Sequence, residues 1–216
     1  MKKLYTLAIF LIAFSINAQE NIKYQKPSKE ILDLVEFERP PSVQYDDDKN
    51  YMVFLYRDNY KSISDLSEKE LRLGGLRINP KTNIGSRVTF YNNVKIKKLK
   101  SKNGPIEQVS GLPDNPKLTN FAWSPDETKV ALTNTTNKGV ELWVLDLETA
   151  SVVKLTEAIL NANTGGVITW QADSQSMLVK TLSKNRKPLI DTSTIVPDGP
   201  TISNNYGAKA QNRTYQ

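Results

Sequence analysis

Residues 121–156 read FAWSPDETKVALTNTTNKGVELWVLDLETASVVKLT, and this stretch decides the fold that we expect. Its apolar runs are short, and clusters of Ser, Pro, Asp, Asn and Gly separate them, which is typical of antiparallel strands joined by turns. We predict one four-stranded sheet, with strands ending at Trp123 and running over 129–133, 140–147 and 152–155. The run at 140–147 is almost continuously apolar, so this strand should be covered on both faces, and the last strand should lie near an edge.

The turn and strand that follow Trp123 recur further along the chain. Residues 170–179, WQADSQSMLV, match residues 123–132, WSPDETKVAL, in register, and Trp170 follows Trp123 by 47 positions. Units of about 45 residues with four strands each are the signature of a β-propeller blade. The alternative is an ordinary antiparallel sandwich in which the Trp-x-x-Asp turns coincide by chance.

A weaker copy of the same pattern, DDKNYMV at 47–53, lies upstream. Aligning Asp47 with Asp126 gives an offset of 79 positions, which leaves room for one divergent unit between the two copies. At about 45 residues per blade, this chain encodes about three to four four-stranded blades, whereas closed rings have about four to eight. The sequence therefore predicts an all-β fold, an incomplete β-propeller at 43–216 whose blades form an open arc.

The chain begins with Lys2 and Lys3 and continues with an apolar run at 4–16. Such a start is typical of a secretory signal peptide, so we predict a signal peptide at 1–18, followed by an N-terminal extension at 19–42. The protein would be exported, periplasmic or secreted, and cleavage would lower its net charge from +6 to +4. A retained membrane anchor is the alternative. No other apolar run approaches membrane length, so no membrane contact is expected after cleavage.

Two short helices are expected outside the strand pattern. One lies within 27–37, with Ser28 as its N-cap. The other lies around 65–73, because Ser67 and Glu70 form a capping-box pattern, and the two glycines that follow would end it. Further strands are predicted at 51–56, 76–79, 88–91 and 94–99, the last of them with the alternation of a half-buried edge strand.

The chain has 0 histidines and 0 cysteines, which removes the usual catalytic groups. A Ser-His-Asp or Cys-His arrangement cannot be built from these residues, and the sequence contains no G-x-S-x-G elbow or phosphate-binding glycine loop. Its Asp and Glu residues are scattered at turns. A carboxylate pair of the glycosidase type stays open in principle, although no pair stands out. We therefore predict no catalytic, cofactor-binding or metal-binding residue, and no cofactor.

Three other features invite a functional interpretation, and each is better explained by structure. The basic stretch at 95–102 contains no aromatic residue, so we expect a solvated strand and no nucleic-acid partner. The acidic run at 46–48 lacks the glycine and the distant glutamate of a calcium loop, so we expect a turn. Trp123, Trp143 and Trp170 are expected to pack between sheets, not to stack on a ligand.

Several runs resemble a known family of serine peptidases. They are Pro27 with EILD at 30–33, YMVFL at 51–55, SISDL at 62–66, ELRLGGLRINPKTN at 70–83, GVELWVLD at 139–146 and RTYQ at 213–216. Together they resemble the glutamyl-endopeptidase-like branch of the prolyl oligopeptidase family. The GGLRINP run is quite specific to this branch, whereas the WSPD turn is shared by many propellers. A glycine would be usual at position 150, where this chain has Ala150.

The resemblance implies a two-part enzyme, in which an N-terminal propeller precedes an α/β-hydrolase domain that carries a Ser-Asp-His triad. It covers only the front of that pattern, so no triad residue can be carried onto this chain. The propeller would act as a filter that limits substrates to peptides. The chain alone should then lack peptidase activity, and it should need the remaining blades or another chain to cover its open ends.

A rival interpretation is non-enzymatic: an exported TolB-like propeller that serves as a protein-binding module. A downstream hydrolase elbow would favour the peptidase, and further blades followed by a stop codon would favour the binding module. A third possibility is a short protein that pairs with another chain to close its ring.

Overall fold

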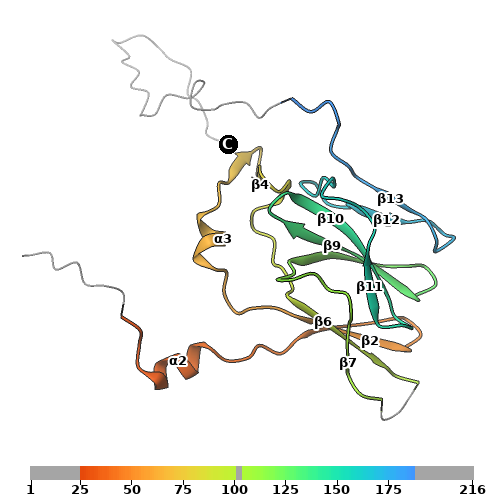
Figure 1. Cartoon of the computed structure of the whole chain (residues 1–216), viewed down its shortest axis with the longest axis horizontal. Helices are drawn as coiled ribbons and strands as arrows, with labels where there is room; N and C mark the ends of the chain where they lie inside the picture. Colours follow the sequence, from red (N-terminus) through yellow and green to blue (C-terminus); the bar gives the residue numbers. More distant parts are fainter. Residues whose placement is uncertain (1–24, 101–103, 188–216) are drawn as a thin grey trace, which may run out of the picture. The chain divides into compact units, whose positions relative to one another are not determined.

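The computed structural model describes residues 25–100 and 104–187, so the predicted signal peptide at 1–18 and the run at 213–216 lie outside the described residues. The described part is mostly β, with two short helices (Figure 1). In chain order the elements are α2 (Lys29–Val35), β1 (Ser42–Tyr45), β2 (Tyr51–Tyr56), α3 (Ile63–Ser67), β3 (Leu71–Leu73), β4 (Leu76–Asn79), β5 (Ile84–Gly85), β6 (Asn93–Lys98), β7 (Glu107–Gln108), β8 (Leu118–Trp123), β9 (Lys129–Thr136), β10 (Gly139–Asp146), β11 (Ser151–Lys154), β12 (Ile168–Trp170) and β13 (Met177–Val179).

The chain forms two compact units, and the described residues of the smaller one are 25–40 and 58–60. This unit contains α2, which confirms the helix expected within 27–37 in a shorter form. Ser28 stands at the N-cap position, but its side chain makes no capping hydrogen bond. Three of its four apolar residues are exposed, Ile31, Leu34 and Val35 at 53%, 79% and 42%, and Leu32 is half-buried.

The larger unit contains all the strands of the described residues, and four of them form the predicted four-stranded sheet, here called sheet 2. Its order is β11-β10-β9-β8, and neighbouring strands are antiparallel. β10 is buried at every position except Asp146, as expected for a strand covered on both faces, and β11 lies at an edge. The sequence therefore predicted this sheet correctly, strand by strand.

Sheet 1 repeats this arrangement, with the order β1-β2-β6-β7. Its second and third strands are separated by residues 57–92, whereas Asn137 and Lys138 alone join β9 to β10. We call residues 61–92 the insert. The divergent unit expected between the upstream copy and sheet 2 is therefore wrong, because the intervening residues belong to the insert and to the second half of sheet 1.

The predicted strand at 94–99 is β6, and it was wrongly expected at an edge. The alternation is right, since Val94 and Ile96 are 1% and 0% exposed. However, β6 pairs with β2 on one side and with the two-residue β7 on the other. The edge prediction failed because such a short strand leaves little trace in sequence.

The insert contains the second helix, but earlier than predicted. α3 begins after Ser62, whose hydroxyl accepts the backbone N–H of Asp65 at 3.1 Å. The prediction from Ser67 was wrong, because Ser62 and Asp65 form the cap and residues 71–73 form strand β3 instead. β3 pairs with β4 through a hairpin whose turn residues, Gly74 and Gly75, have φ of 52° and 86°.

The insert contains a small antiparallel sheet of its own, with the order β3-β4-β5. A separate two-stranded sheet, which we call sheet 3, consists of β12 and β13. The strand expected at 76–79 is β4, whereas 88–91 forms no strand and contributes only an isolated bridge from Tyr91 to Leu118. The described residues thus hold two four-stranded sheets and one two-stranded sheet in series. The complete set of blades stays a prediction.

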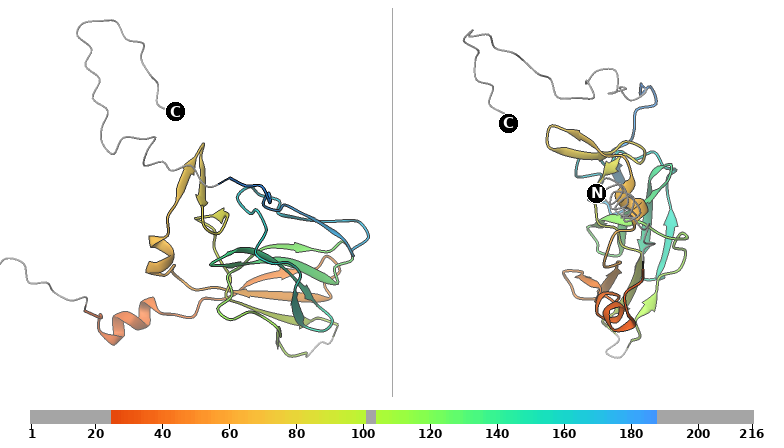
Figure 2. Two further views of the ribbon diagram at one scale, coloured as in Figure 1. Left: turned by 45° about the horizontal axis from the view of Figure 1, so that its top comes forward. Right: turned by 90° about the vertical axis from the view of Figure 1, so that its left-hand side faces the viewer.

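Sheets 1, 2 and 3 lie face to face in that order (Figures 1 and 2). We call the face of a sheet that points toward the next sheet its forward face, and the opposite face its back face. One buried cluster joins the forward face of sheet 1 to the back face of sheet 2 through, among others, Val53, Leu55, Ile96, Val130, Leu132, Trp143 and Leu145.

A second cluster joins the forward face of sheet 2 to the back face of sheet 3. Its buried members include Ala131, Val140, Leu142 and Val144, against which Ile168, Trp170, Met177 and Val179 pack. Ile84 of the insert, only 2% exposed, belongs to the same cluster. Sheet 2 is therefore covered on both faces.

The turn after the first strand has the same conformation in all three sheets. Lys49, Glu127 and Ser174 occupy its left-handed position, with φ of 55°, 57° and 55°. The amide of each donates to the carbonyl three positions earlier, at 3.1, 2.9 and 3.1 Å, and these carbonyls belong to Asp46, Ser124 and Gln171.

This geometry corrects the alignment of the upstream copy by one residue. Asp46 takes the place of Ser124, so the offset is 78 and not 79, because Lys49 matches Glu127. The side chains agree: Asp46 Oδ1 accepts the amide of Tyr51 at 2.6 Å, and Ser124 Oγ accepts the amide of Lys129 at 3.0 Å. The offset of 47 between sheets 2 and 3 is confirmed by the match of Glu127 with Ser174.

The same contact joins each sheet to the one before it. The Glu127 carboxylate accepts the amide of Asp47 in sheet 1 at 2.9 and 3.0 Å. The Oε2 atom of the same carboxylate also accepts the amide of Asp48 at 3.5 Å. Asp48 is equivalent to Asp126 of sheet 2, whose amide donates to Ser174 Oγ at 3.0 Å. Each left-handed turn residue thus binds the turn of the preceding sheet.

The tryptophans repeat in the same way. Trp123 Nε1 donates to Gln44 Oε1 at 3.2 Å, and Trp170 Nε1 donates to the carbonyl of Ala122 at 2.9 Å. Gln44 and Ala122 are equivalent at the offset of 78. Both tryptophans therefore pack between sheets, as predicted. We call the turn contact and the tryptophan contact together the junction.

Candidate functional site

The part of the chain that the structure describes brings no catalytic set together. Among residues 25–100 and 104–187, no group of three or more Asp or Glu side chains could hold a metal ion. The acidic run at 46–48 forms the predicted turn, with Asp46 only 2% exposed and accepting two backbone amides. The most informative polar features are instead one buried carboxylate in sheet 2 and a charged network in the insert.

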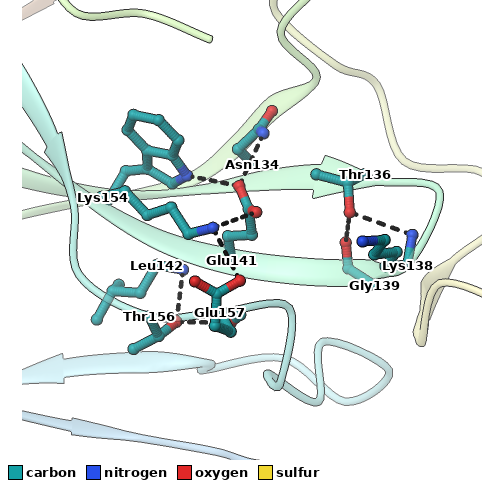
Figure 3. Close-up of polar contacts among 10 residues, drawn as sticks. Asn134, Thr136, Lys138, Gly139, Glu141, Leu142, Lys154, Thr156 and Glu157 are labelled. Carbon is teal, nitrogen blue, oxygen red and sulfur yellow. Dashed lines mark hydrogen bonds and ion pairs between the residues drawn. The ribbon is translucent and has the colours of Figure 1, made fainter.

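Glu141 is the buried carboxylate, and its residue is 8% exposed. It lies on the back face of sheet 2, in β10, directly opposite Asn134 of β9. Its Oε2 accepts Trp143 Nε1 at 2.9 Å and Asn134 Nδ2 at 3.2 Å, and its Oε1 lies 3.0 Å from Lys154 Nζ (Figure 3). Lys154 also contacts Glu157 at 3.0 Å.

These contacts decide the charge of Glu141. Burial by itself raises the pKa of this carboxyl, but the hydrogen bonds from Lys154, Trp143 and Asn134 outweigh it, so the pKa is lowered. The group stays ionised at neutral pH and has no proton to donate. We conclude that Glu141 braces strands β9, β10 and β11 and is no general acid.

Sequence reasoning missed this cluster, although one signal was present. Glu141 is the only charged residue between Val140 and Leu145 in an otherwise apolar run. A charge inside a strand that is covered on both faces requires a partner, since an unpaired buried charge is costly. The partner could not be identified until the pairing of Trp143 with Lys154 was known.

The insert has its own charged network around Glu70. Its Oε1 accepts from Arg72 Nε at 2.9 Å and from Arg77 Nη1 at 2.8 Å, and Ser86 Oγ donates to its Oε2. The Ser86 hydroxyl and both arginines lower the pKa of Glu70 to about 2. Arg72 and Arg77 face each other across β3 and β4, so this carboxylate also screens two like charges.

The insert is fixed to sheets 2 and 3 at one end. Lys117 Nζ, just before β8, lies 2.6 Å from Asp65 Oδ1 of α3, and the amide of Ala162 donates to the carbonyl of Asn83 at 2.9 Å. Asn134 Oδ1 accepts the amide of the same Lys117 at 3.0 Å. The insert and the Glu141 cluster therefore lie at the same end of sheet 2, which we call the insert end.

The basic stretch lies partly outside the described residues, because 101–103 is not described. Within it, Lys95 Nζ stands 5.0 Å from the centre of the Tyr56 ring, an aromatic partner from the neighbouring strand that the sequence did not reveal. Lys98 Nζ donates to the carbonyl of Glu148 at 2.6 Å, and the hydroxyl of Tyr51 donates to the Glu148 carboxylate at 2.8 Å. These contacts link the inner strands β2 and β6 of sheet 1 to the turn between β10 and β11 of sheet 2.

No helix in the described ranges 25–100 and 104–187 is long and apolar enough to span a membrane.

Comparison with known proteins gives two relatives and no matching family model. The chain is 31% identical over 208 residues to a protein named "Probable glutamyl endopeptidase, chloroplastic" from Oryza sativa subsp. japonica. It is 30% identical over 209 residues to a protein of the same name from Arabidopsis thaliana. Both alignments cover 89% of this chain but only 22% and 21% of the relatives, so the chain spans about a fifth of their length. The names of both relatives point to a peptidase family.

Proposed function

We propose that this chain forms the first blades of the β-propeller of an exported serine peptidase, in the glutamyl-endopeptidase-like branch of the prolyl oligopeptidase family. In this proposal the chain carries no catalytic group. It filters the peptides that reach a Ser-Asp-His triad in a separate α/β-hydrolase domain.

The repeated junction is the observation that carries the propeller part of the proposal. A propeller places each blade on the next by the same rotation, so the same contacts should recur at every interface. Glu127 and Ser174 make equivalent turn contacts, with the amides of Asp48 and Asp126, and Trp123 and Trp170 make equivalent ring contacts. A two-sheet sandwich provides one interface and gives no reason for a second, equivalent one.

The relatives support the peptidase part. An alignment over 89% of this chain leaves little of it unmatched, and the relatives are named as glutamyl endopeptidases. We infer that the substrates are peptides with glutamyl residues. The insert is suited to the filtering role, because it occupies one end of the stacked sheets and its Arg72 side chain is 74% exposed.

A chimera tests this proposal. This chain replaces the matching segment of the rice relative, and the chimera is assayed with a short glutamyl peptide and with a folded globular protein. We expect cleavage of the peptide and little cleavage of the folded protein. The control is the relative without the segment, which should lose this size discrimination.

Two outcomes would contradict the proposal. One is a chimera that cleaves the short peptide yet attacks the folded protein as fast as the control does. The other is turnover of glutamyl or prolyl peptides by the purified chain alone, with stoichiometric labelling of one of its serines by a fluorophosphonate probe. The second result would place the nucleophile in this chain, although it has 0 histidines to act as the base.

Export of the protein is the remaining part of the proposal, after the propeller and the peptidase parts. Signal peptidase should cleave after residue 18, as the basic and apolar start of the sequence indicates. N-terminal sequencing of the protein from a bacterial periplasm should then begin at Gln19. A sequence that still begins at Met1 would contradict export by cleavage.

A further inference from the structure

The hairpin of β3 and β4 in the insert carries an open sheet edge. The small sheet of the insert has the order β3-β4-β5, so within the described residues one side of β3 has no neighbouring strand. The hairpin projects from the stacked sheets (Figure 2). A further sheet of the stacked series would lie on sheet 3, whereas this edge belongs to the insert that interrupts sheet 1. The open edge of β3 is therefore not a face that the next sheet of the series would cover.

The turn of this hairpin fixes the backbone pairing of its two strands. The turn residues, Gly74 and Gly75, have φ of 52° and 86°, and positive φ at both positions is the mark of a type I′ turn. Such a two-residue turn closes on a hydrogen-bonded pair, here Leu73 and Leu76. The pairing along the rest of the hairpin follows from this pair, because hydrogen-bonded and non-hydrogen-bonded pairs alternate along antiparallel strands.

Arg72 and Arg77 form the next pair, whose backbones share no hydrogen bond. The amide and carbonyl of each of these residues therefore point away from the other strand. The Arg77 carbonyl agrees with this, since it accepts the amide of Ser86, directly after β5, at 2.9 Å. The amide and carbonyl of Arg72 accordingly point out of the open edge, where they are available to the backbone of a ligand.

The side chain of Arg72 adds a carboxylate-binding group to the same edge. Its Nε donates to Glu70 Oε1 at 2.9 Å, and this contact holds one side of the guanidinium group. Its two Nη atoms contact no residue in the described ranges 25–100 and 104–187, and the side chain is 74% exposed. A guanidinium fork of this kind binds a carboxylate through two parallel hydrogen bonds.

The charge of the hairpin also favours an acidic ligand. The pKa of Glu70 is about 2, so this carboxylate is ionised at neutral pH, but it faces two arginines, Arg72 and Arg77. One positive charge is left over on this face of the hairpin. The insert as a whole has 6 basic and 3 acidic residues, which gives it a net charge of +3.

The opposite face of the hairpin is apolar. Side chains alternate along a strand, so Leu71 and Leu73 lie on the face away from Arg72, paired with Ile78 and Leu76 of β4. Leu73 and Leu76 are 56% and 44% exposed. A strand added to the edge would thus meet a positive charge on one face and apolar side chains on the other.

We propose that β3 binds an extended peptide as an additional antiparallel strand, with a glutamate of the peptide directly opposite Arg72. The backbone of this glutamate exchanges two hydrogen bonds with the amide and carbonyl of Arg72. Its carboxylate binds the free Nη atoms of the same arginine. The apolar neighbours of the glutamate pack beside Leu71 and Leu73. The site therefore recognises the pattern apolar-Glu-apolar in an extended chain.

This inference rests on the filtering role proposed above and specifies what the filter recognises. Strand addition requires a backbone whose amides and carbonyls are unpaired, and folded proteins keep such edges short or covered. An extended glutamyl peptide satisfies the requirement. The edge of β3 therefore discriminates by conformation as well as by charge.

The test is fluorescence anisotropy of a dye-labelled peptide, TLELT with blocked ends, titrated with the purified 216-residue chain. The peptide should bind, and the same peptide with glutamine in place of glutamate should bind about tenfold more weakly, because it lacks the charge-assisted hydrogen bonds. A third peptide, with a methyl group on the glutamate nitrogen, keeps the carboxylate but loses a backbone hydrogen bond. It should also bind at least about tenfold more weakly, because the methyl group prevents strand pairing.

Two variants locate the site. Arg72→Gln should weaken binding of the glutamate peptide about tenfold and leave binding of the glutamine peptide unchanged. Lys81→Gln is the matched control: it removes one positive charge from the same insert, at an exposed residue outside β3, and should bind both peptides like the wild type. Thermal melting of each variant checks that it is folded.

Four results would overturn the proposal. They are a folded wild-type chain that does not bind the glutamate peptide, equal binding of the glutamate and glutamine peptides, full binding of the methylated peptide, and an Arg72→Gln variant that binds like the wild type. The proposed function has a separate readout in the chimera. A chain that fails to bind the peptide, together with a size-selective chimera, would reject this inference alone. Binding as expected, together with a chimera that does not discriminate by size, would reject the filtering role.

Discussion

Sheets 1 and 2 have the same strand order and the same first turn, yet they differ in what covers them and in how their middle strands are joined. Sheet 2 connects β9 to β10 through two residues and is buried on both faces. Sheet 1 has the insert at this place, and its back face lies outside both buried clusters. The comparison shows that the strand order is a property of each sheet by itself, whereas the burial of its faces depends on the sheets that pack against it.

The largest expected effect separates a covered face from an exposed one. Leu142→Ala removes a side chain that is 4% exposed between sheets 2 and 3, and should lower the free energy of unfolding by about 2–5 kcal/mol. Leu178→Ala removes the same group at 66% exposure, and should cost less than about 0.5 kcal/mol in a monomeric chain. Urea unfolding at low concentration measures both. Equal losses would mean that the forward face of sheet 3 is buried within one molecule.

The next effect tests the equivalence of the first turns. Asp46→Ala removes a buried carboxylate that accepts the amides of Asn50 and Tyr51 at 2.8 and 2.6 Å, and should cost about 2–3 kcal/mol. Asp46→Ser installs the residue that sheet 2 uses at Ser124, which accepts one amide of the following strand, and should recover about half of that loss. Chemical denaturation at pH 7 compares the two. A serine variant as unstable as the alanine variant would contradict the offset of 78.

The sequence predicted sheet 2 well because its four strands follow one another with short turns. The match between 123–132 and 170–179 also predicted the turn in sheet 3 and both packed tryptophans. In each case the information is local, since a turn residue and the strand after it are neighbours in the chain.

The insert defeated this approach in sheet 1. Residues 57–92 separate β2 from β6, so the repeat stretches to 78 positions and imitates a missing unit. The identical letters Asp47 and Asp126 then fixed the alignment one residue away from the geometric match, which depends on the left-handed Lys49 and Glu127. Amino-acid identity is a poor guide at such a turn, because the backbone conformation and not the side chain defines the position.

The Glu141 cluster could be suspected from sequence but not assembled from it. Its partners come from three strands, and only the register of β9, β10 and β11 brings Asn134 and Lys154 to the same carboxylate. The proposed filtering role is still less visible in the residues of the chain, since such a role requires no reactive group that sequence could reveal. The resemblance of the GGLRINP run pointed to glutamyl endopeptidases, and the two relatives agree with it.

A smaller effect concerns the charge that only sheet 2 buries. Lys154→Met leaves Glu141 ionised with two neutral donors and should lower the free energy of unfolding at pH 7, moderately because Lys154 is 32% exposed and solvent screens the pair. Glu157→Gln removes the 83% exposed partner of the same lysine, and should cost less than about 0.5 kcal/mol. The double variant Lys154→Met with Glu141→Gln should recover part of the loss.

The pH dependence of the Lys154→Met effect has a definite sign. The folded pKa of Glu141 is lowered from 4.5, so its ionised form stabilises the fold fully above pH 4.5, and this contribution is lost as the pH falls through the folded pKa. The gap in stability between the wild type and Lys154→Met should therefore shrink below pH 4.5. Urea unfolding between pH 7 and acid conditions measures it. A gap that stays constant would show that the pair contributes through packing and not through charge.

The smallest effect sharpens the comparison within sheet 2 itself, at the turn before β11. Ala150 is 7% exposed and has φ of 52°, a left-handed conformation that costs an alanine about 1–2 kcal/mol and a glycine almost nothing. Ala150→Gly relieves this strain, but it also loses a buried methyl group, worth about 0.8 kcal/mol, and makes the unfolded chain freer by about 0.4–1 kcal/mol. The terms nearly cancel, so we expect a change in unfolding free energy within about 1 kcal/mol.

Ala131→Gly is the matched control, because Ala131 is 0% exposed in strand β9 and has no such strain to relieve. It should lose the methyl group and gain unfolded-state freedom without compensation, at a cost of about 1–2 kcal/mol. The difference between the two variants isolates the strain, and calorimetric melting of both measures it. Equal destabilisation would show that Ala150 sits in its turn without strain, and that the glycine usual at this position in the resembling family is absent here at no cost.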